Sequence, residues 1–350
     1  MLYKFLFRPF LFRFHPETAH RLTFSLLRTL RRLQPVRALI RALYRKEYPA
    51  LRREVFGIDF PNPVGLAAGL DKNGELYNPL SDFGFGFVEI GSLTPQPQEG
   101  NPRPRVFRLT RDRALINRMG INNKGVRHAI SQLQRHPPRI LVAASLAKNT
   151  VSTSDDDTLR DYVNAFSSLY DFVDFFVLNV SCPNVEGMTD LQDISYLSDI
   201  LDELLSLRLC YDVSKPILIK VSPDIETEQL DHILDYALYS GVDGIVATNT
   251  TRSREGLRTS PERLEDIGRG GLSGAPLFEK SLSLVRYIHE KTLGRLPIIG
   301  CGGISTPEQA EAMLAAGASL IEVYTGFIYE GPGMVKRILK HLENKSKANK

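Results

Sequence analysis

The predicted fold depends on one stretch, Phe175-Phe176-Val177-Leu178-Asn179-Val180-Ser181-Cys182-Pro183-Asn184-Val185-Glu186-Gly187. Its first half is a continuous apolar run, which is typical of a strand buried on both faces. The strand must end at Pro183, because proline cannot continue a central ladder. Cys182 stands at that end between the amides of Asn179 and Asn184 and is a candidate catalytic base. A buried thiol beside an ordinary turn is the alternative interpretation.

Seven further apolar segments surround this one in the chain. The eight predicted strands are 64–68, 87–91, 140–146, 175–180, 217–221, 244–248, 297–300 and 320–324, and helical periodicity separates most of them at 159–170, 194–207, 227–239, 282–291, 307–316 and 335–342. Eight such steps predict a closed (β/α)8 TIM barrel whose chemistry lies at the carboxyl ends of the strands. Residues 93–125 and 250–274 are expected to be irregular loops on that rim, with no second sheet. An open doubly wound sheet is the alternative, which the lack of a glycine-rich fingerprint disfavours.

Composition excludes several other classes of protein. The 350 residues are 43% hydrophobic, enough for one barrel with an appendage or for two domains. The three cysteines and seven histidines show no spacing for a disulfide framework or a metal site. We therefore expect no bound metal, and we expect the protein to reside in a reducing compartment. No Walker A, G-x-G-x-x-G or H-E-x-x-H sequence occurs, which argues against phosphotransfer, a Rossmann domain and zinc hydrolysis.

Charge separates residues 1–53 from the rest of the chain. This segment holds thirteen lysines and arginines against two glutamates, a net charge of +11, and residues 54–350 carry −7. We therefore expect a basic N-terminal extension at 1–53 and a barrel domain at 54–350.

Two amphipathic helices are predicted in the extension, forming a helical hairpin. The first begins at Pro16 and carries an apolar stripe, and the second follows Gln34-Pro35 with leucines on one face and Arg37, Arg41 and Arg45 on the other. No run approaches the roughly 18 apolar residues of a membrane span, so these basic helices with a phenylalanine-rich start predict peripheral contact with an anionic membrane surface. A hairpin packed on its own domain is the alternative. Nucleic-acid binding is not expected, because the basic residues are interleaved with apolar stripes.

The strand ends place polar residues on one predicted rim. Lys72 and Lys220 would lie there with several amides, and Lys220 ends an apolar run, where an unpaired ammonium would be costly. The turn Gly302-Gly303 follows the seventh strand, where barrels commonly hold phosphate on backbone N–H groups. Each feature alone has an ordinary explanation as a turn or a solvated lysine. Together they indicate a flavin, which accepts hydride and needs its developing negative charge stabilised.

The rim motifs closely resemble those of dihydroorotate dehydrogenase over nearly the whole chain. They are Ala67-Ala68-Gly69-Leu70-Asp71-Lys72, Asn117-Arg118-Met119-Gly120, Asn179-Val180-Ser181-Cys182-Pro183-Asn184, Thr248-Asn249-Thr250, Gly270-Gly271-Leu272-Ser273-Gly274 and Gly302-Gly303. The runs His15-Pro16-Glu17-Thr18-Ala19-His20 and 100–108 are similar to the membrane-associated, quinone-reducing class 2 branch. The resemblance implies oxidation of dihydroorotate to orotate in pyrimidine biosynthesis, with FMN reoxidised by a membrane quinone.

The resemblance also implies roles for individual residues. Cys182 would be the catalytic base. FMN would be bound by Ala68, Gly69, Leu70, Asp71, Lys72, Ser92, Ser145, Asn179, Lys220, Thr248, Gly274, Gly303, Tyr324 and Thr325. Dihydroorotate would be bound by Lys72, Asn117, Arg118, Met119, Gly120, Ile121, Asn179, Asn184, Asn249 and Thr250. A quinone tunnel would be lined by His20, Arg108 and Tyr324.

Three positions depart from the pattern of the family. Ser145 stands where an asparagine is usual, Ile121 where a phenylalanine is usual, and Cys182 where class 2 enzymes usually have serine. Cysteine there is typical of the class 1 enzymes, so a soluble acceptor, fumarate or NAD, is the alternative to quinone. A non-catalytic barrel that binds a phosphorylated ligand and docks to membrane is a further alternative. The expected location is the cytoplasmic face of the cell inner membrane, without an obligatory protein partner.

Overall fold

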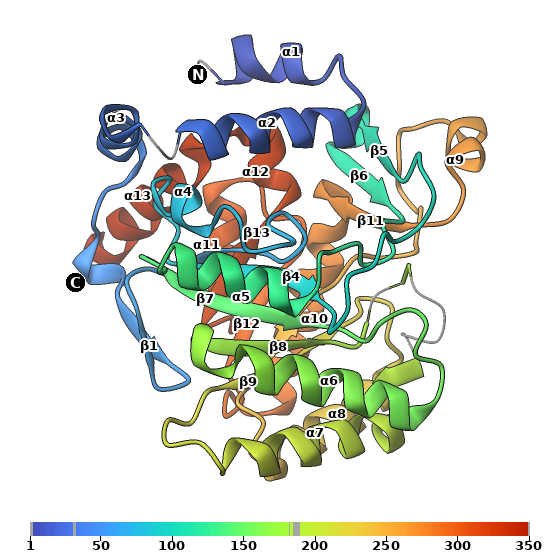
Figure 1. The fold of residues 1–350 in the computed structure, drawn as a ribbon. Helices are drawn as coiled ribbons and strands as arrows, with labels where there is room; N and C mark the ends of the chain where they lie inside the picture. Colours follow the sequence, from blue (N-terminus) through green and yellow to red (C-terminus); the bar gives the residue numbers. More distant parts are fainter. Residues whose placement is uncertain (1–2, 31–32, 182, 185–189, 349–350) are drawn as a thin grey trace.

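A computed structural model describes residues 3–30, 33–181, 183–184 and 190–348 of the chain (Figure 1). Its centre is a closed barrel of eight parallel strands, in which each strand pairs with the next along the chain and the last pairs with the first. The strands are β3 (Val64–Leu66), β4 (Phe87–Leu93), β7 (Leu141–Leu146), β8 (Phe175–Asn179), β9 (Ile217–Val221), β10 (Gly244–Ala247), β12 (Ile298–Cys301) and β13 (Leu320–Val323). This architecture confirms the predicted TIM barrel and all eight predicted strands.

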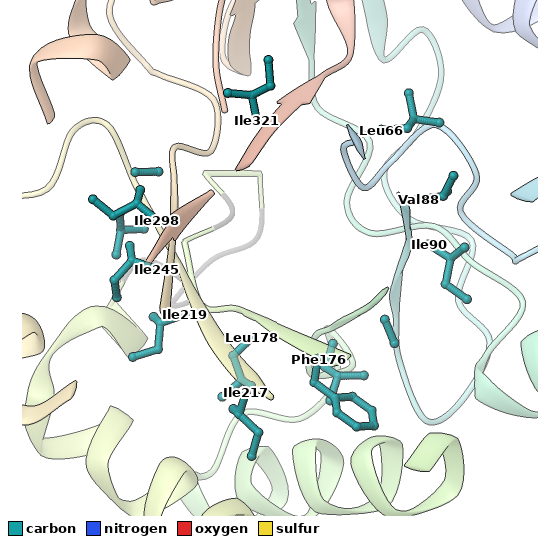
Figure 2. Packing of buried hydrophobic residues seen from close by; sticks show 14 of the residues in the cluster. Leu66, Val88, Ile90, Phe176, Leu178, Ile217, Ile219, Ile245, Ile298 and Ile321 are labelled. Carbon is teal, nitrogen blue, oxygen red and sulfur yellow. The ribbon is translucent and has the colours of Figure 1, made fainter. Parts of the chain in front are cut away.

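Helices cover the outside of the barrel because the outward faces of its strands are apolar. Side chains such as Ile219, Ile245 and Ile298 point outward from the ring of strands, and all are fully buried (Figure 2). The covering helices are α4 (Tyr77–Ser81), α5 (Val126–Arg135), α6 (Asp155–Leu169), α7 (Ile194–Arg208), α8 (Thr227–Ser240), α10 (Phe278–Lys291), α11 (Pro307–Ala315) and α13 (Gly333–Ala348). The six helices predicted between the strands are among them.

The barrel interior is filled at its amino-terminal end. A hairpin of β1 (Arg53–Val55) and β2 (Ile58–Phe60) covers that end, and the ring of Phe60 packs against Phe87 at 5.4 Å and Phe175 at 6.0 Å. This aromatic plug makes the barrel a packed core rather than a pore. Open space is therefore left at the carboxyl ends of the strands.

A second sheet at the rim corrects the expectation of irregular loops. The antiparallel strands β5 (Val106–Leu109) and β6 (Ala114–Asn117) pair with each other, and β11 (Gly271–Gly274) pairs with β6. β6 and β11 lie about 150 residues apart in the sequence, so no local pattern announces their pairing. The small elements of the rim and loops are α9 (Pro261–Ile267), α12 (Thr325–Glu330), η2 (Pro49–Leu51), η3 (Thr110–Asp112), η4 (Tyr170–Phe172), η5 (Asp190–Gln192) and η6 (Ala275–Leu277).

The N-terminal segment lies over the open end of the barrel (Figure 1). A π-helical turn η1 (Tyr3–Phe7) and the short helix α1 (Arg8–Leu11) form an outer layer above α2 (Pro16–Leu30), and α3 (Gln34–Tyr44) follows at the side. The two helices predicted in this segment are confirmed. Within the described residues, no helix combines the length and apolarity needed to cross a membrane.

The orientation of α3 differs from the expected one. Arg37 was assigned to a polar outer face, yet its guanidinium is buried and donates two hydrogen bonds to Asp82, at 2.7 and 3.1 Å. Leu39 and Leu43 point to solvent instead and are 60% and 51% exposed. The buried Asp82 carboxylate requires a cationic partner, and this requirement outweighs the burial of two leucines.

Candidate functional site

One continuous cavity of about 1300 Å³ joins the carboxyl end of the barrel to the N-terminal helices. Its inner part is lined by polar residues from the strand ends, among them Lys220, Asn179 and Thr248. Its outer part is lined by apolar side chains of α1, α2 and the turn between them, such as Phe10, Leu26 and Phe14. The site therefore has a polar chamber with an apolar approach.

A buried cation forms the floor of the polar chamber. The Lys220 ammonium at the end of β9 lies 2.9 Å from Glu89 Oε2 of β4 and 3.5 Å from Glu322 Oε2 of β13. Burial alone would lower the pKa of Lys220, but the two neighbouring carboxyl groups raise it above its ordinary value. The lysine is therefore charged. Glu89 and Glu322 are the partners that an ammonium inside an apolar run needs.

A chain of hydrogen bonds crosses one wall of the chamber. The Ser145 and Ser92 hydroxyl oxygens lie 2.8 Å apart, and the Asn179 amide donates to Ser92 Oγ at 2.8 Å. Asn249 donates in turn to Asn179 Oδ1 at 3.1 Å and to Ser181 Oγ at 3.0 Å. Four different strand ends are tied together in this way, so the expected Ser92, Ser145, Asn179 and Asn249 do come together.

A second amide group lies where the antiparallel sheet meets the loop after β8. The Asn184 amide donates to Asn117 Oδ1 at 3.1 Å, and Asn184 Oδ1 accepts from the Gly271 N–H at 3.2 Å. Ile121 is buried nearby, and Met119, Gly120 and Thr250 also line the cavity.

Arg118 is the expected substrate residue that points elsewhere. Its guanidinium donates to the carbonyl oxygens of Ile267 and Arg269 and lies 4.6 Å over the ring of Phe107. Arg118 therefore connects the second sheet, through Phe107, to the segment after α9, although its neighbours Asn117 and Met119 line the cavity.

Glycines shape the opposite wall, beside Tyr324 and Thr325. A Cβ atom at Gly303, whose φ is +72°, would lie 2.4 Å from the backbone nitrogen of Phe278. Gly274 has φ +103° and is equally crowded, with Thr325 Cγ2 2.9 Å from a Cβ added there. Burial raises the pKa of Tyr324 to about 12, so its hydroxyl stays protonated and donates to the Gly69 carbonyl at 3.3 Å.

The turn after β3 carries Lys72 to the cavity. Asp71 stabilises this turn, because its carboxylate accepts from the backbone N–H groups of Glu75 at 2.8 Å and Leu76 at 2.7 Å. Burial raises the pKa of Asp71 to about 6, although these hydrogen bonds oppose the shift. Ala68, Gly69, Leu70 and Lys72 all line the cavity.

The expected tunnel residues lie at the boundary between α2 and the barrel. His20 Nε2 is 3.2 Å from the Leu70 carbonyl oxygen, and its ring lies 3.9 Å from that of Phe24. Arg108 donates to the carbonyl oxygens of Phe12 at 3.2 Å and Phe14 at 2.7 Å. Together with Tyr324, both residues line the same cavity.

Comparison with known proteins decides the family. Residues 50–345 match the profile of the dihydroorotate dehydrogenase family. The chain belongs to this family. It is 44% identical to the dihydroorotate dehydrogenase (quinone) of Christiangramia forsetii over 96% of this chain and 97% of that one. It is 45% identical to the enzyme of the same name from Thermosynechococcus vestitus, over 97% and 96%.

Solved structures of the family share the fold. The dihydroorotate dehydrogenase of Eimeria tenella in complex with ferulenol superposes with a TM-score of 0.84 at 33% identity, covering 95% of this chain and 92% of that one. The ligand-free form from the same organism gives 0.85 at 32% identity, covering 95% and 96%. The predicted resemblance to dihydroorotate dehydrogenase is thus confirmed.

The sequence analysis did not single out Glu89 and Glu322, and a third residue of interest, Cys182, lies outside the described part of the chain. Glu89 and Glu322 are charged residues inside buried strands, the same signal that drew attention to Lys220. Ser181, the neighbour of the expected base Cys182, is buried and donates to the Lys220 carbonyl oxygen at 2.6 Å.

Proposed function

We propose that this protein oxidises dihydroorotate to orotate in pyrimidine biosynthesis, with FMN as the bound cofactor and a membrane quinone as the final electron acceptor. The observation that carries the proposal is the single cavity that joins a cationic, amide-lined chamber to an apolar approach. The quinone-linked names of the curated relatives support the choice of acceptor.

The residues of the chamber fit FMN. A flavin supplies a hydride acceptor that gains negative charge on reduction, and the buried Lys220 ammonium is placed to stabilise that charge. Ser92, Asn179 and Thr248 would contact the ring, and the backbone of Ala68 and Gly69 would lie against it. The phosphate would be held at Gly274, Gly303, Tyr324 and Thr325, where side chains on the two glycines would clash with the chain itself.

Dihydroorotate fits the second amide group. Its carboxylate would pair with Lys72, and its ring N–H and carbonyl groups would match the amides of Asn117, Asn184 and Asn249. Such a site would discriminate strongly against analogues that lack these groups, because its own amides would be left unpaired. We assign Cys182 as the base that removes the C5 proton, since a thiol ionises more readily than a serine hydroxyl.

The quinone would enter between the N-terminal helices. His20 and Arg108 lie where the apolar walls reach the chamber, beside Tyr324. The outer surface of these helices is suited to an anionic membrane. Among the described residues, nine of the fifteen exposed large apolar side chains belong to this segment, and they are Phe5, Leu6, Phe7, Phe10, Leu22, Leu26, Leu33, Leu39 and Leu43.

These features support a functional division of the chain. Residues 1–53 would form the membrane and quinone extension, and residues 54–350 the FMN-binding barrel. Exposed cations, including Arg13, Arg21 and Arg28, accompany the apolar side chains of the extension and would each add about 1 kcal/mol at an anionic surface. We therefore place the protein as a peripheral component on the cytoplasmic face of the inner membrane.

Two measurements test the proposal. The purified protein should carry flavin absorbance, and adding dihydroorotate without oxygen should bleach it. Turnover should then be compared with quinone, fumarate and NAD as acceptors. Quinone is expected to support turnover, whereas preferential use of fumarate or NAD would replace the quinone assignment with a soluble acceptor. A colourless protein that cannot be loaded with FMN would contradict the whole proposal.

A further inference from the structure

Glu89 and Glu322 are two carboxyl residues at the inner end of the cavity, which Glu322 lines together with Lys220. Both are buried, with 0% and 1% of their surface exposed. Lys220 lies beside both.

Three oxygens of this pair have no hydrogen-bond donor among the described residues. They are Glu89 Oε1 and both carboxyl oxygens of Glu322. Glu89 Oε2, by contrast, accepts from Lys220 Nζ at 2.9 Å and from the Ala68 N–H at 3.2 Å. Glu89 Oε2 is thus held by two hydrogen-bond donors, whereas the Glu322 carboxyl group makes the longer contact of 3.5 Å between its Oε2 and the Lys220 ammonium.

The charge balance points the same way. Two carboxylates facing one ammonium would leave a net negative charge in a buried site, and two carboxyl groups that share such a site do not readily both ionise. Among the described residues, Cys301 of β12 is a further titratable group beside them, and burial raises the pKa of its thiol, so it contributes no charge at neutral pH. Burial and the nearby Glu89 likewise raise the pKa of Glu322 well above its ordinary value.

We infer that Glu89 and Glu322 share one proton, carried by Glu322 and donated to Glu89, so that the floor of the cavity is electrically neutral. The proton supplies the missing donor for Glu89 Oε1. Glu322 is then a positioning residue that acts through Glu89 on Lys220. This role rests on the proposed FMN site, because a neutral floor leaves the Lys220 charge available to the flavin, which an ionised Glu322 would offset.

Infrared spectroscopy of the FMN-loaded protein tests the shared proton directly. At pH 8, two units above the pKa of Asp71, the spectrum should contain the carbonyl band of a buried protonated carboxyl group that shifts in D2O. The band should vanish in Glu322→Gln and persist in Glu290→Gln, a control at an exposed position on α10. No substrate or acceptor is needed, so the result is independent of the proposed reaction.

The reduction potential of the bound flavin provides a second readout. Glutamine is a neutral isostere of protonated glutamate, so Glu322→Gln should leave the potential near neutral pH unchanged. If Glu322 is ionised in the native protein, the substitution removes a negative charge and raises the potential. Absence of the band from the native protein, its persistence in Glu322→Gln, or a raised potential in that variant would each overturn the inference.

Discussion

His20 and Leu70 link the N-terminal extension to the catalytic rim, with 3.2 Å between His20 Nε2 and the Leu70 carbonyl oxygen. Leu70 lies in the turn that presents Lys72 to the cavity. A side chain of α2 therefore contacts the backbone on which a proposed substrate residue depends. Protonation of His20 would therefore affect the backbone of that turn.

His20 should make stability depend on pH. Burial, reinforced by Lys72, lowers the pKa of His20 to about 4 from 6.5, although the Leu70 carbonyl opposes the shift. Between these values the unfolded chain binds a proton at His20 that the folded chain excludes, so the contribution of His20 to the free energy of unfolding should fall as pH decreases from about 6.5 to about 4. The loss should be at most about 3 kcal/mol. The raised pKa of Asp71 has the opposite effect in both proteins, so the test is the difference between the native protein and His20→Gln in urea denaturation at several pH values. Parallel pH profiles would contradict the assignment.

Asp82→Asn should detach α3 from the barrel. The substitution leaves the Arg37 guanidinium buried without its carboxylate, and breaking such a pair costs about 3–5 kcal/mol. Limited proteolysis should then cut near α3 faster than in the native protein. Arg41→Ala is the control, because Arg41 lies 3.7 Å from Asp82 and its side chain is partly exposed, so its loss should cost less than about 1 kcal/mol. Equal cleavage of both variants would show that the buried pair does not hold the helix.

Leu39→Ser with Leu43→Ser should weaken binding to anionic lipid vesicles. Both leucines are exposed on α3, and each buried leucine contributes about 1.5–3 kcal/mol to partition into an apolar phase. Co-sedimentation should fall at least tenfold, while flavin reduction by dihydroorotate is unaffected. The matched control is Leu209→Ser with Val213→Ser, which removes exposed apolar side chains outside the extension. If both pairs reduce binding equally, the extension is not the membrane-contacting surface.

Gly303→Ala should weaken FMN binding. A Cβ there would lie 2.4 Å from the Phe278 backbone nitrogen, so the loop must move away from the proposed phosphate position. Gly256→Ala is a control for backbone strain alone, since Gly256 has φ +70° with no atom within 4 Å of the added Cβ. Flavin content after dialysis should drop for the first variant and not for the second. Retention of FMN by Gly303→Ala would place the phosphate elsewhere.

Cys182→Ala should slow flavin reduction by dihydroorotate by about 10²–10⁴-fold, the usual contribution of a general base. Cys182→Ser should retain part of the rate and require higher pH, because a hydroxyl ionises far less readily than a thiol. Both variants should still bind orotate, since the amides of Asn117 and Asn184 are unchanged. Stopped-flow reduction at several pH values provides the measurement. A Cys182→Ala rate close to the native one would move the base elsewhere on the rim.

The sequence determined the barrel and the strand ends that carry its polar residues. Continuous apolar runs at eight places leave few alternatives to strands buried on both faces, and strand polarity then brings residues as distant as Ser92 and Asn249 to one rim. The motifs at those ends were sufficient to identify the family before any contact was known.

Tertiary structure decided what depends on partners far away in the chain. The pairing of β6 with β11, the inward turn of Arg37 toward Asp82 and the outward turn of Arg118 each satisfy a distant polar group that no local pattern reveals. Lys220 is a further example. Its place in an apolar run is visible in the sequence, but its two carboxyl partners are visible only in the fold. Hydrophobic periodicity is local and can be read from the chain, whereas the pairing of buried charges is a property of the folded interior.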